Sequence, residues 1–266
     1  MIIRGKVVVV TGGGSGLGRQ LVLGLLERGA RVAALDIRHE SLAETSRQSS
    51  AGDSLSTHVL DVSDREAVLR VPEQVINRHG AVDGVIHNAG LIQPFVRFVD
   101  LDYPAIERVV NVNLYGTIHI AKAFLPYLTA RPEASFAVVS SAGGFLPLAG
   151  QGIYGATKAS VKLLTEGLSS ELSGTSVNVS VVFPGSVNTE IAANSGVDMG
   201  ERFESSTRSS PGTRAEDAAR IILDGIEDRR LHIYVGRDAR LLNLASRVAP
   251  RLATRLIYKR LSDLLP

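Results

Sequence analysis

Four consecutive valines lead directly into a cluster of glycines near the start of the chain, in the segment VVVVTGGGSGLGRQL at residues 7–21. β-Branched residues favour a strand, whereas glycines permit tight turns and a close approach of another group to the backbone. The residues that follow have the apolar spacing of a helix, whose N-terminus offers free N–H groups and a partial positive charge to an anion. The segment therefore predicts a strand, a phosphate-binding turn and a helix, with a turn that is merely tight as the alternative.

Short β-rich runs alternate with longer helical patterns along the whole chain. Strands are expected at residues 7–10, 31–35, 56–60, 82–87, 135–139, 177–182 and 232–235, and helices at 17–28, 40–48, 65–78, 103–128, 152–172 and 215–227. The strands are apolar throughout, which indicates burial on both faces, and helix-length connections indicate right-handed βαβ crossovers. The sequence predicts one α/β domain at residues 1–236, a doubly wound seven-stranded parallel sheet with helices on both faces, and a helical tail at 237–266. The polar stretch at 195–213 predicts a functional loop.

Composition excludes several classes of protein. The chain has 266 residues, 44% of them hydrophobic, no cysteine and a net charge of +2. Thiol chemistry is therefore excluded, and the charge balance gives nucleic-acid binding no support. No apolar run reaches the roughly 18 residues of a membrane span, and the first residues show no separate leader, so we expect a cytoplasmic protein. The six histidines lack metal-ligand spacing, so we expect no metal site.

The glycine spacing distinguishes between kinds of phosphate-binding turn. A P-loop requires a lysine and a hydroxyl residue after its last glycine, where this chain continues with RQ. The usual G-x-G-x-x-G pattern also fails, because Leu17 stands where a glycine is needed. The pattern present is T-G-x-x-x-G-x-G at residues 11–18. The glycines of G-x-G-x-x-G and those of T-G-x-x-x-G-x-G serve the same purpose, which is to bring the pyrophosphate of a dinucleotide to the helix N-terminus.

Two aspartates follow the second and third expected strands. Asp36 ends the segment RVAALD, where a carboxylate accepts hydrogen bonds from the adenosine ribose hydroxyls and repels a 2′-phosphate. Ser15 and Ile37 supply no cation beside it, and Arg38 lies two residues on, so the sequence favours NAD over NADP. Asp61 occupies the equivalent place one unit later, where it can reach the adenine amino group or act as a turn residue.

Several motifs in order resemble those of the single-domain short-chain dehydrogenases and reductases. They are TGGGSGLG, HNAG at residues 87–90, NVN at 111–113, VVSSAGG, YGATK and PGSVNT, and the resemblance spans about residues 5–235. The family more often has asparagine where His87 stands. The resemblance implies a Rossmann fold, a nicotinamide cofactor and transfer of a hydride between that cofactor and an alcohol or carbonyl carbon.

Tyr154 and Lys158 lie one helical turn apart in GIYGATKASVKLL, so their side chains project from one face. A free tyrosine ionises near pH ~10. We expect the lysine ammonium, together with an oxidised nicotinamide, to lower the pKa of the tyrosine and make it a usable acid or base. A surface pair is the alternative for a Tyr-Lys spacing taken alone.

The resemblance adds two further catalytic residues. Ser141 is chosen over Ser140 by its spacing to Tyr154, and its hydroxyl would hold the substrate oxygen. Asn113 is chosen over Asn111; in the family this asparagine kinks its helix and holds a water that links the lysine to solvent. The alternative for Asn113 is a core amide bonded to neighbouring backbone.

The expected cofactor-binding residues come from the strand ends and from the P-G-x-V-x-T turn. They are Gly12, Ser15, Gly16, Leu17, Gly18, Asp36, Ile37, Asp61, Val62, Asn88, Ala89, Gly90, Tyr154, Lys158, Pro184, Gly185, Val187 and Thr189. The expected substrate contacts are Ser141, Phe145, Gln151 and Tyr154. Because residues 145–148 are apolar, we expect a largely apolar secondary alcohol or ketone, of steroid, retinoid, terpenoid or acyl type.

The tail at residues 237–266 holds seven Lys or Arg against two Asp and breaks near Pro250. On a helical projection, Arg240, Arg247 and Arg251 share one side, and apolar residues such as Leu242 lie mainly opposite. The favoured prediction packs the apolar side on the body or on a partner subunit. The alternative is peripheral contact of the tail with an anionic membrane.

Three functions of different kind fit these observations. The leading prediction is an NAD-dependent oxidoreductase that acts on a small hydrophobic alcohol or ketone and forms a homodimer or homotetramer. The second is an NADPH-dependent ketone or 3-oxoacyl reductase, against which Asp36 argues. The third is a non-catalytic nucleotide-binding regulator, against which the retained Tyr154 and Lys158 argue.

Overall fold

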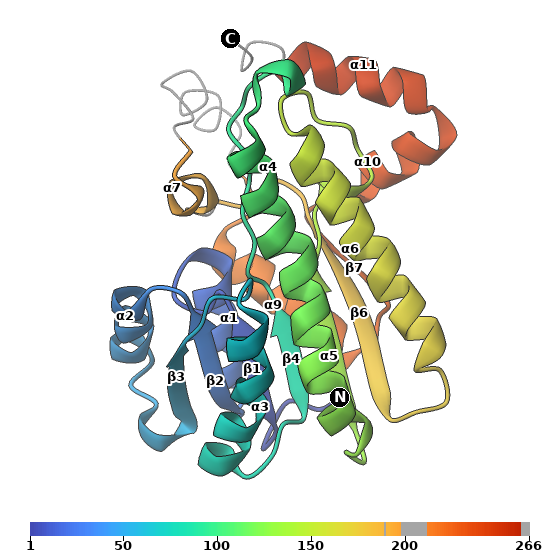
Figure 1. Ribbon diagram of the computed structural model, residues 1–266. Helices are drawn as coiled ribbons and strands as arrows, with labels where there is room; N and C mark the ends of the chain where they lie inside the picture. The colour runs from blue at the N-terminus through green and yellow to red at the C-terminus, as the bar shows by residue number, and fades with distance from the viewer. Residues whose placement is uncertain (189, 198–211, 262–266) are drawn as a thin grey trace.

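The protein folds around a seven-stranded parallel sheet in the strand order β3-β2-β1-β4-β5-β6-β7 (Figure 1). The computed structural model describes residues 1–188, 190–197 and 212–261. Its strands are β1 (Val7–Thr11), β2 (Arg31–Asp36), β3 (Leu55–Val59), β4 (Gly84–His87), β5 (Ala134–Val139), β6 (Val177–Pro184) and β7 (His232–Val235). The order reverses at β1, which is the point where open α/β sheets bind ligands. The predicted fold class and sheet are confirmed.

The helices alternate with the strands as expected. They are α1 (Gly16–Glu27), α2 (His39–Ser49), α3 (Arg65–His79), α4 (Tyr103–Val110), α5 (Gly116–Thr129), α6 (Gly152–Glu171), α7 (Ile191–Ser195), α9 (Ala215–Glu227), α10 (Arg237–Val248) and α11 (Pro250–Leu261). Short turns of helix occur at η1 (Gly52–Ser54), η2 (Phe98–Asp100), η3 (Asn111–Tyr115) and η4 (Ala142–Gly144). Most of the predicted boundaries agree within two residues. The predicted loop at 195–213 begins at the end of α7, and its residues 198–211 lie outside the described part.

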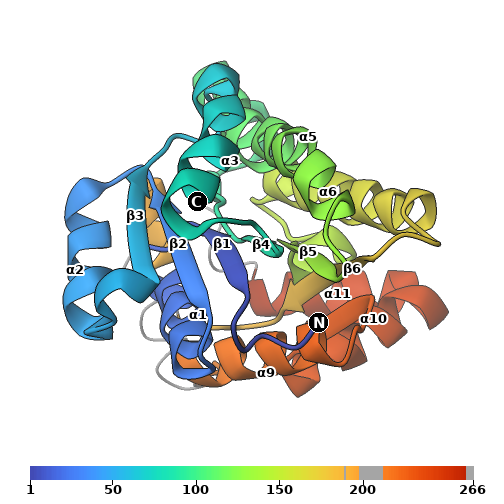
Figure 2. The same ribbon diagram turned by 90° about the horizontal axis from the view of Figure 1, so that it is seen from below.

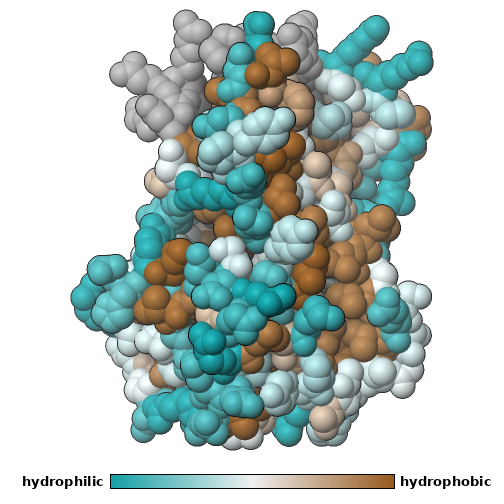
Figure 3. All heavy atoms as spheres, in the orientation of Figure 1, coloured by the Kyte–Doolittle hydropathy of each residue, from teal (hydrophilic) through white to brown (hydrophobic). Residues whose placement is uncertain are grey.

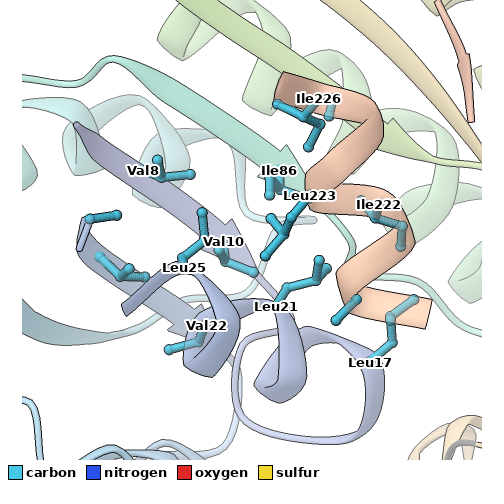
Figure 4. Packing of buried hydrophobic residues seen from close by; sticks show 14 of the residues in the cluster. Val8, Val10, Leu17, Leu21, Val22, Leu25, Ile86, Ile222, Leu223 and Ile226 are labelled. Atoms are coloured by element: carbon cyan, nitrogen blue, oxygen red, sulfur yellow. The ribbon is translucent and has the colours of Figure 1, made fainter. Parts of the chain in front are cut away.

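Two hydrophobic layers cover the two faces of the sheet. Viewed from below, α1 and α9 lie on one side and α3, α5 and α6 on the other (Figure 2). On the first side, Leu21 and Leu25 of α1 meet Ile222 and Leu223 of α9 over the strand residue Val10 (Figure 4). Every residue of β1 is buried, as predicted from its valines. Full burial of one large apolar side chain stabilises the fold by about 1.5–3 kcal/mol. This packing fixes the strands that lie beneath the site.

The helical segment predicted at residues 103–128 contains an irregularity. Between α4 and α5, the residues Asn111–Tyr115 form a π-helical turn. A π turn widens the backbone by one residue and is frequent at functional sites. Here it carries Asn113, whose side chain is buried.

The start of α6 is held by a residue from a distant loop. The side-chain oxygen of Gln93 accepts hydrogen bonds from the backbone N–H groups of Ile153 and Tyr154, at 2.8 and 3.0 Å. The backbone oxygen of Gln93 accepts a third bond, from Nε2 of Gln151 at 2.7 Å. First-turn N–H groups of a helix have no partner within the helix, so Gln93 caps α6 in place of a local residue. Tyr154 is thereby tied to the segment after β4.

The tail forms two helices that break at Ala249, as predicted from Pro250. Leu242 and Ala245 of α10 and Ala253 of α11 pack with Phe145, Leu146 and Leu148 after β5. Part of the predicted apolar side therefore packs on the body. Leu252 of α11 is instead 58% exposed, because α10 and α11 are separate helices with different directions. None of the described helices has the length and apolarity to cross a bilayer.

We expect Gln93→Ala to lower the free energy of unfolding by about 2 kcal/mol, because one buried and one partly buried N–H group of α6 lose their acceptor. Urea denaturation of the two proteins measures the difference. The matched control is Gln48→Ala, since Gln48 bonds only at the surface, to Glu44 of its own helix. Equal stability of Gln93→Ala and Gln48→Ala would show that α6 does not depend on this cap.

Candidate active site

A cavity of about 520 Å³ lies at the carboxyl ends of the central strands, within the size range of small-molecule sites. Its walls come from the segments that follow β1, β2, β3, β4, β5 and β6 and from the start of α1. The predicted residues that line it are Gly12, Ser15, Gly16, Leu17, Gly18, Asp36, Ile37, Asp61, Val62, Asn88, Ala89, Gly90, Ser141, Tyr154, Lys158, Pro184, Gly185 and Val187. The structure thus brings together residues that are up to about 175 positions apart in the chain.

The glycine turn after β1 forms one end of the cavity. Gly12 has a φ of +67°, a conformation that side chains rarely adopt, and a Cβ atom there would lie 2.8 Å from Nδ2 of Asn88. The Thr11 hydroxyl accepts the backbone N–H groups of Asn88 and Ala89 at 3.0 and 3.1 Å. The turn after β1 and the turn after β4 are therefore fixed to each other, and the N-terminus of α1 opens between them into the cavity.

Asp36 lies beside this turn and is almost buried. Its carboxylate accepts hydrogen bonds from the backbone N–H groups of Gly14 and Arg38, both at 3.0 Å. The Arg38 side chain lines the cavity, with Nε 4.0 Å from the Asp36 carboxylate and Nη2 3.2 Å from the Ser15 hydroxyl. Ser15 and Ile37 supply no cation, but Arg38, two residues on, does, because the backbone turn after β2 brings its side chain back to the carboxylate.

Asp61 and Val62 line the neighbouring part of the cavity. The Asp61 carboxylate also accepts the N–H and the hydroxyl of Ser63, at 2.8 and 2.7 Å. These are the bonds of a turn residue, which was the alternative proposed for Asp61. The second carboxylate oxygen is still able to accept from a ligand, and the role of Asp61 toward the adenine amino group stays a prediction.

Tyr154 and Lys158 project from the buried face of α6. Burial raises the pKa of Tyr154, and a hydrogen bond with Ser141 partly offsets that rise. Burial lowers the pKa of Lys158 to about 8, and its Nζ donates to the carbonyl of Val139 at 2.9 Å. Nζ lies 6.0 Å from the centre of the Tyr154 ring. Desolvation of the phenol is thus the larger effect on Tyr154, and the expected lowering of its pKa by Lys158 together with an oxidised nicotinamide stays a prediction.

The two neighbouring serines after β5 have different partners. The Ser140 hydroxyl donates to the backbone oxygen of Lys158 at 2.8 Å and anchors α6 to the strand. The Ser141 hydroxyl accepts the N–H of Gly143 at 3.0 Å and bonds Tyr154. Ser141 is therefore the serine whose hydroxyl faces the tyrosine.

Asn113 lies behind the cavity wall and does not line it. Its side chain accepts the N–H of Leu91 at 2.8 Å and donates to the Leu91 carbonyl at 2.9 Å and to the Thr157 hydroxyl at 3.1 Å. These contacts are those of a core amide bonded to neighbouring backbone. They also place Gly90 close to Lys158, since a Cβ atom on Gly90 would lie 3.1 Å from Nζ of Lys158 and 3.2 Å from Oδ1 of Asn113.

His87, the departure from the family motif, is buried and neutral. Burial and the nearby Lys158 charge lower its pKa to about 3. Its Nδ1 lies 2.8 Å from the Thr11 hydroxyl. Because that hydroxyl accepts two N–H groups, we infer that it donates its proton to Nδ1 and that His87 carries its own proton on Nε2.

Two further predicted residues, Phe145 and Gln151, do not line the cavity. Phe145 packs edge-on against Phe183, with ring centres 5.6 Å apart, and Gln151 bonds Gln93. The Oε1 atom of Gln151 is buried with no hydrogen-bond partner among the described residues. Thr189 lies outside the described residues. The substrate roles of Phe145 and Gln151 and the cofactor role of Thr189 stay predictions.

Helix α7, which the sequence pattern does not predict, covers one side of the cavity. Nδ2 of Asn194 donates to the Ser15 hydroxyl at 2.9 Å, across the mouth from the glycine turn. The Ser195 hydroxyl accepts the N–H of Ile92 at 3.0 Å, and its carbonyl accepts Nη1 of Arg108 at 3.3 Å. Five residues are too few for a periodic signal, so only the position of this segment after β6 could have indicated its role.

Comparison with known proteins agrees with this geometry. Residues 6–200 match the family described as short chain dehydrogenase. The putative oxidoreductase SadH of Mycobacterium tuberculosis is 33% identical over 98% of this chain and 97% of that protein. The 3-oxoacyl-[acyl-carrier-protein] reductase FabG of Thermotoga maritima is 33% identical over 71% of this chain and 77% of that protein.

Solved structures superimpose on nearly the whole chain. A short-chain dehydrogenase/reductase from Burkholderia phymatum in complex with NAD has a TM-score of 0.82 and 25% identity, over 93% of this chain and 96% of that one. A short-chain dehydrogenase from Burkholderia cenocepacia in complex with NADP has a TM-score of 0.81 and 26% identity, over 97% and 99%. The chain belongs to the short-chain dehydrogenase family and is an oxidoreductase with a Rossmann fold.

Proposed function

We propose that this protein is an NAD-dependent oxidoreductase that interconverts a secondary alcohol and a ketone. The main observation in support of the proposal is that two sets of residues line the same cavity. Asp36 and the glycine turn lie at one end, and Ser141, Tyr154 and Lys158 supply hydroxyl, phenol and ammonium groups from β5 and α6. A site of this kind holds a dinucleotide and a carbonyl oxygen together.

The residues present fit a nicotinamide dinucleotide. The N-terminus of α1 faces the cavity and favours the negative charge of a pyrophosphate, and the Asp36 carboxylate accepts from ribose hydroxyls. Ser15, Asn88 and Val187 supply further polar and backbone groups along the same wall. When bound, the nicotinamide supplies or accepts the hydride.

Tyr154 handles the proton in this proposal. Because burial raises its pKa, the phenol is protonated at neutral pH and can donate to the oxygen of a ketone as the alcohol forms. In the reverse direction the phenolate takes the proton of the alcohol. The Ser141 hydroxyl, which bonds Tyr154, holds the same substrate oxygen. Lys158 stabilises the phenolate by its positive charge from within the same buried region.

Asn113 acts in this proposal as a positioning residue. Its two bonds to Leu91 and its bond to Thr157 connect the π-helical turn, the segment after β4 and α6. The water that the family resemblance assigns to Asn113 would lie beside Lys158, whose pKa of about 8 suits transfer of a proton to and from solvent.

An apolar alcohol or ketone is the proposed substrate. The end of β5 and the segments after β4 and β6 contribute apolar residues to the cavity wall, which are Val139, Leu91, Val187 and Ile191. Self-association is also part of the proposal, because an apolar band lies exposed over α5 and α6 (Figure 3), where Leu163 is 69% exposed. A homodimer or homotetramer would bury such a band.

A second candidate is an NADPH-dependent ketone or 3-oxoacyl reductase. Arg38 supports it, since a guanidinium at the ribose end of the cavity could pair with a 2′-phosphate. Arg108 and Glu190, which also line the cavity, extend the range of substrates to polar ones. The similarity to a 3-oxoacyl-[acyl-carrier-protein] reductase is consistent with this alternative.

Replacing the phenol tests whether the protein is an enzyme at all. We expect Tyr154→Phe to lower the rate of NAD⁺ reduction with a panel of hydrophobic secondary alcohols by about 10²–10⁴-fold, because no group remains to move the proton. Cofactor affinity, measured by calorimetry, stays within a few-fold. Tyr103→Phe is the control, since Tyr103 is 78% exposed. Unchanged turnover in Tyr154→Phe would favour the nucleotide-binding regulator.

The burial of Lys158 predicts a pH dependence of stability. Between about pH 8 and 10.5 the unfolded chain binds more protons at this lysine than the folded one, so stability rises with pH. We expect the free energy of unfolding of the wild type, relative to Lys158→Met, to rise by about 2 kcal/mol from pH 8 to pH 10. Tyr154 stays protonated over this range because its pKa is raised. Urea titrations at pH 8, 9 and 10 would show parallel stabilities if Lys158 were well solvated.

Cofactor choice depends on the Asp36 charge. We expect Asp36→Asn to weaken NAD⁺ binding by about 10–100-fold, because charge-assisted hydrogen bonds to the ribose are lost. NADP⁺ binding should strengthen, since Arg38 remains and the repulsion is removed. Calorimetric titration of both cofactors measures the change, with Glu40→Gln on the exposed start of α2 as the control. A wild type that already prefers NADP⁺ would contradict the NAD assignment.

A further inference from the structure

The helix α10 presents large hydrophobic side chains to solvent on the face opposite its packing face. Leu241, Leu244 and Val248 are 65%, 60% and 76% exposed. Their spacing of three and four residues places them on one side of the helix, and we call them the tail ridge. Single exposed apolar residues are ordinary, but three aligned on one helix face form a surface that is suited to a partner.

The packing of the opposite face holds the tail ridge in place. Ala239 is fully buried, and Nδ2 of Asn243 donates to the Tyr234 hydroxyl of β7 at 2.8 Å. Leu242 and Ala245 pack with Leu146 in the segment after β5. The tail ridge is therefore the outer side of a helix that is anchored to the body, with its orientation fixed before any partner arrives.

Arginines flank the tail ridge. Arg240, Arg247, Arg251 and Arg255 are all exposed. Residues 239–255 contain no Asp or Glu, so this stretch carries a charge of +4. An apolar stripe bordered by arginines is typical of helices that lie in the headgroup region of an anionic membrane.

A second copy of the chain fits the tail ridge less well. A two-fold interface would bring the same four arginines of both copies together, and like charges across an interface oppose association. The apolar band over α5 and α6, where Leu163 of α6 is exposed, offers another surface for self-association. Charge complementarity therefore selects an anionic lipid surface as the occupant.

We propose that α10 docks on an anionic bilayer, with the tail ridge entering the headgroup region and Arg240, Arg247 and Arg251 contacting lipid phosphates. α10 also contacts η4, which directly follows Ser141. Figure 1 shows α10 and α11 at the end of the molecule where α7 lies, which is the end at which the cavity opens. Docking through this surface turns the mouth of the cavity toward the lipid. This inference goes beyond the proposed redox activity and does not depend on it.

Vesicle co-sedimentation tests the proposal on the full chain without any turnover. We expect the wild type to bind vesicles that contain phosphatidylglycerol more tightly than vesicles of phosphatidylcholine alone, and to bind less at high salt. Leu241→Ser, Leu244→Ser and Val248→Ser together should reduce partitioning by about tenfold or more. Each of Arg247→Gln and Arg251→Gln should reduce it by about fivefold.

Matched variants separate the tail ridge from general surface effects. Val59→Ser with Leu69→Ser removes exposed apolar residues of β3 and α3, and Arg65→Gln with Arg220→Gln removes exposed charges elsewhere. These four changes should leave vesicle binding unaltered, and all variants should keep the melting temperature and NAD⁺ affinity of the wild type. The proposal is overturned if the wild type binds phosphatidylglycerol vesicles no more tightly than phosphatidylcholine vesicles. It is also overturned if the triple serine variant still binds phosphatidylglycerol vesicles. A triple variant that changes the oligomer mass in light scattering overturns it as well, since the tail ridge would then bind a second copy.

Discussion

The burial of an ionisable pair is the constraint on which the site depends. Lys158 and Tyr154 both lie on the buried face of α6, where water does not solvate them. Their charged forms are therefore costly unless protein groups replace the hydrogen bonds of water. The carbonyl of Val139 and the hydroxyl of Ser141 are those groups. Both come from the end of β5. The position of α6 against β5 therefore determines the protonation states of the two groups.

The segment after β4 maintains that position from the other side of the cavity. Three consecutive residues each bond a different element: Leu91 bonds the π-helical turn, Ile92 bonds α7, and Gln93 bonds the start of α6. A displacement of this segment would therefore move Tyr154 at the start of α6, the π-helical turn and helix α7 together. Gln93 thus acts on the site through the position of Tyr154, although Gln93 does not line the cavity.

The sequence was sufficient for the sheet, the order of elements and most of the cavity wall, because those depend on local patterns. Valine runs define strands, and glycine spacing defines the turn after β1. What it could not supply were contacts between distant segments. The return of Arg38 over Asp36, the cap of α6 by Gln93 and the bond of Asn194 to Ser15 each join side chains whose proximity only the folded backbone creates.

The electrostatics of the pair show the same limit. From the one-turn spacing, the lysine charge together with an oxidised nicotinamide was expected to lower the pKa of the tyrosine, and spacing alone gives no measure of burial. In the folded protein desolvation raises the pKa of Tyr154 and lowers the pKa of Lys158 to about 8, so the two values move apart. A wider gap makes transfer of a proton from the phenol of Tyr154 to the amine of Lys158 cost more free energy. Burial therefore makes Lys158 the group of the pair that exchanges a proton near pH 8, while the phenol of Tyr154 keeps its own.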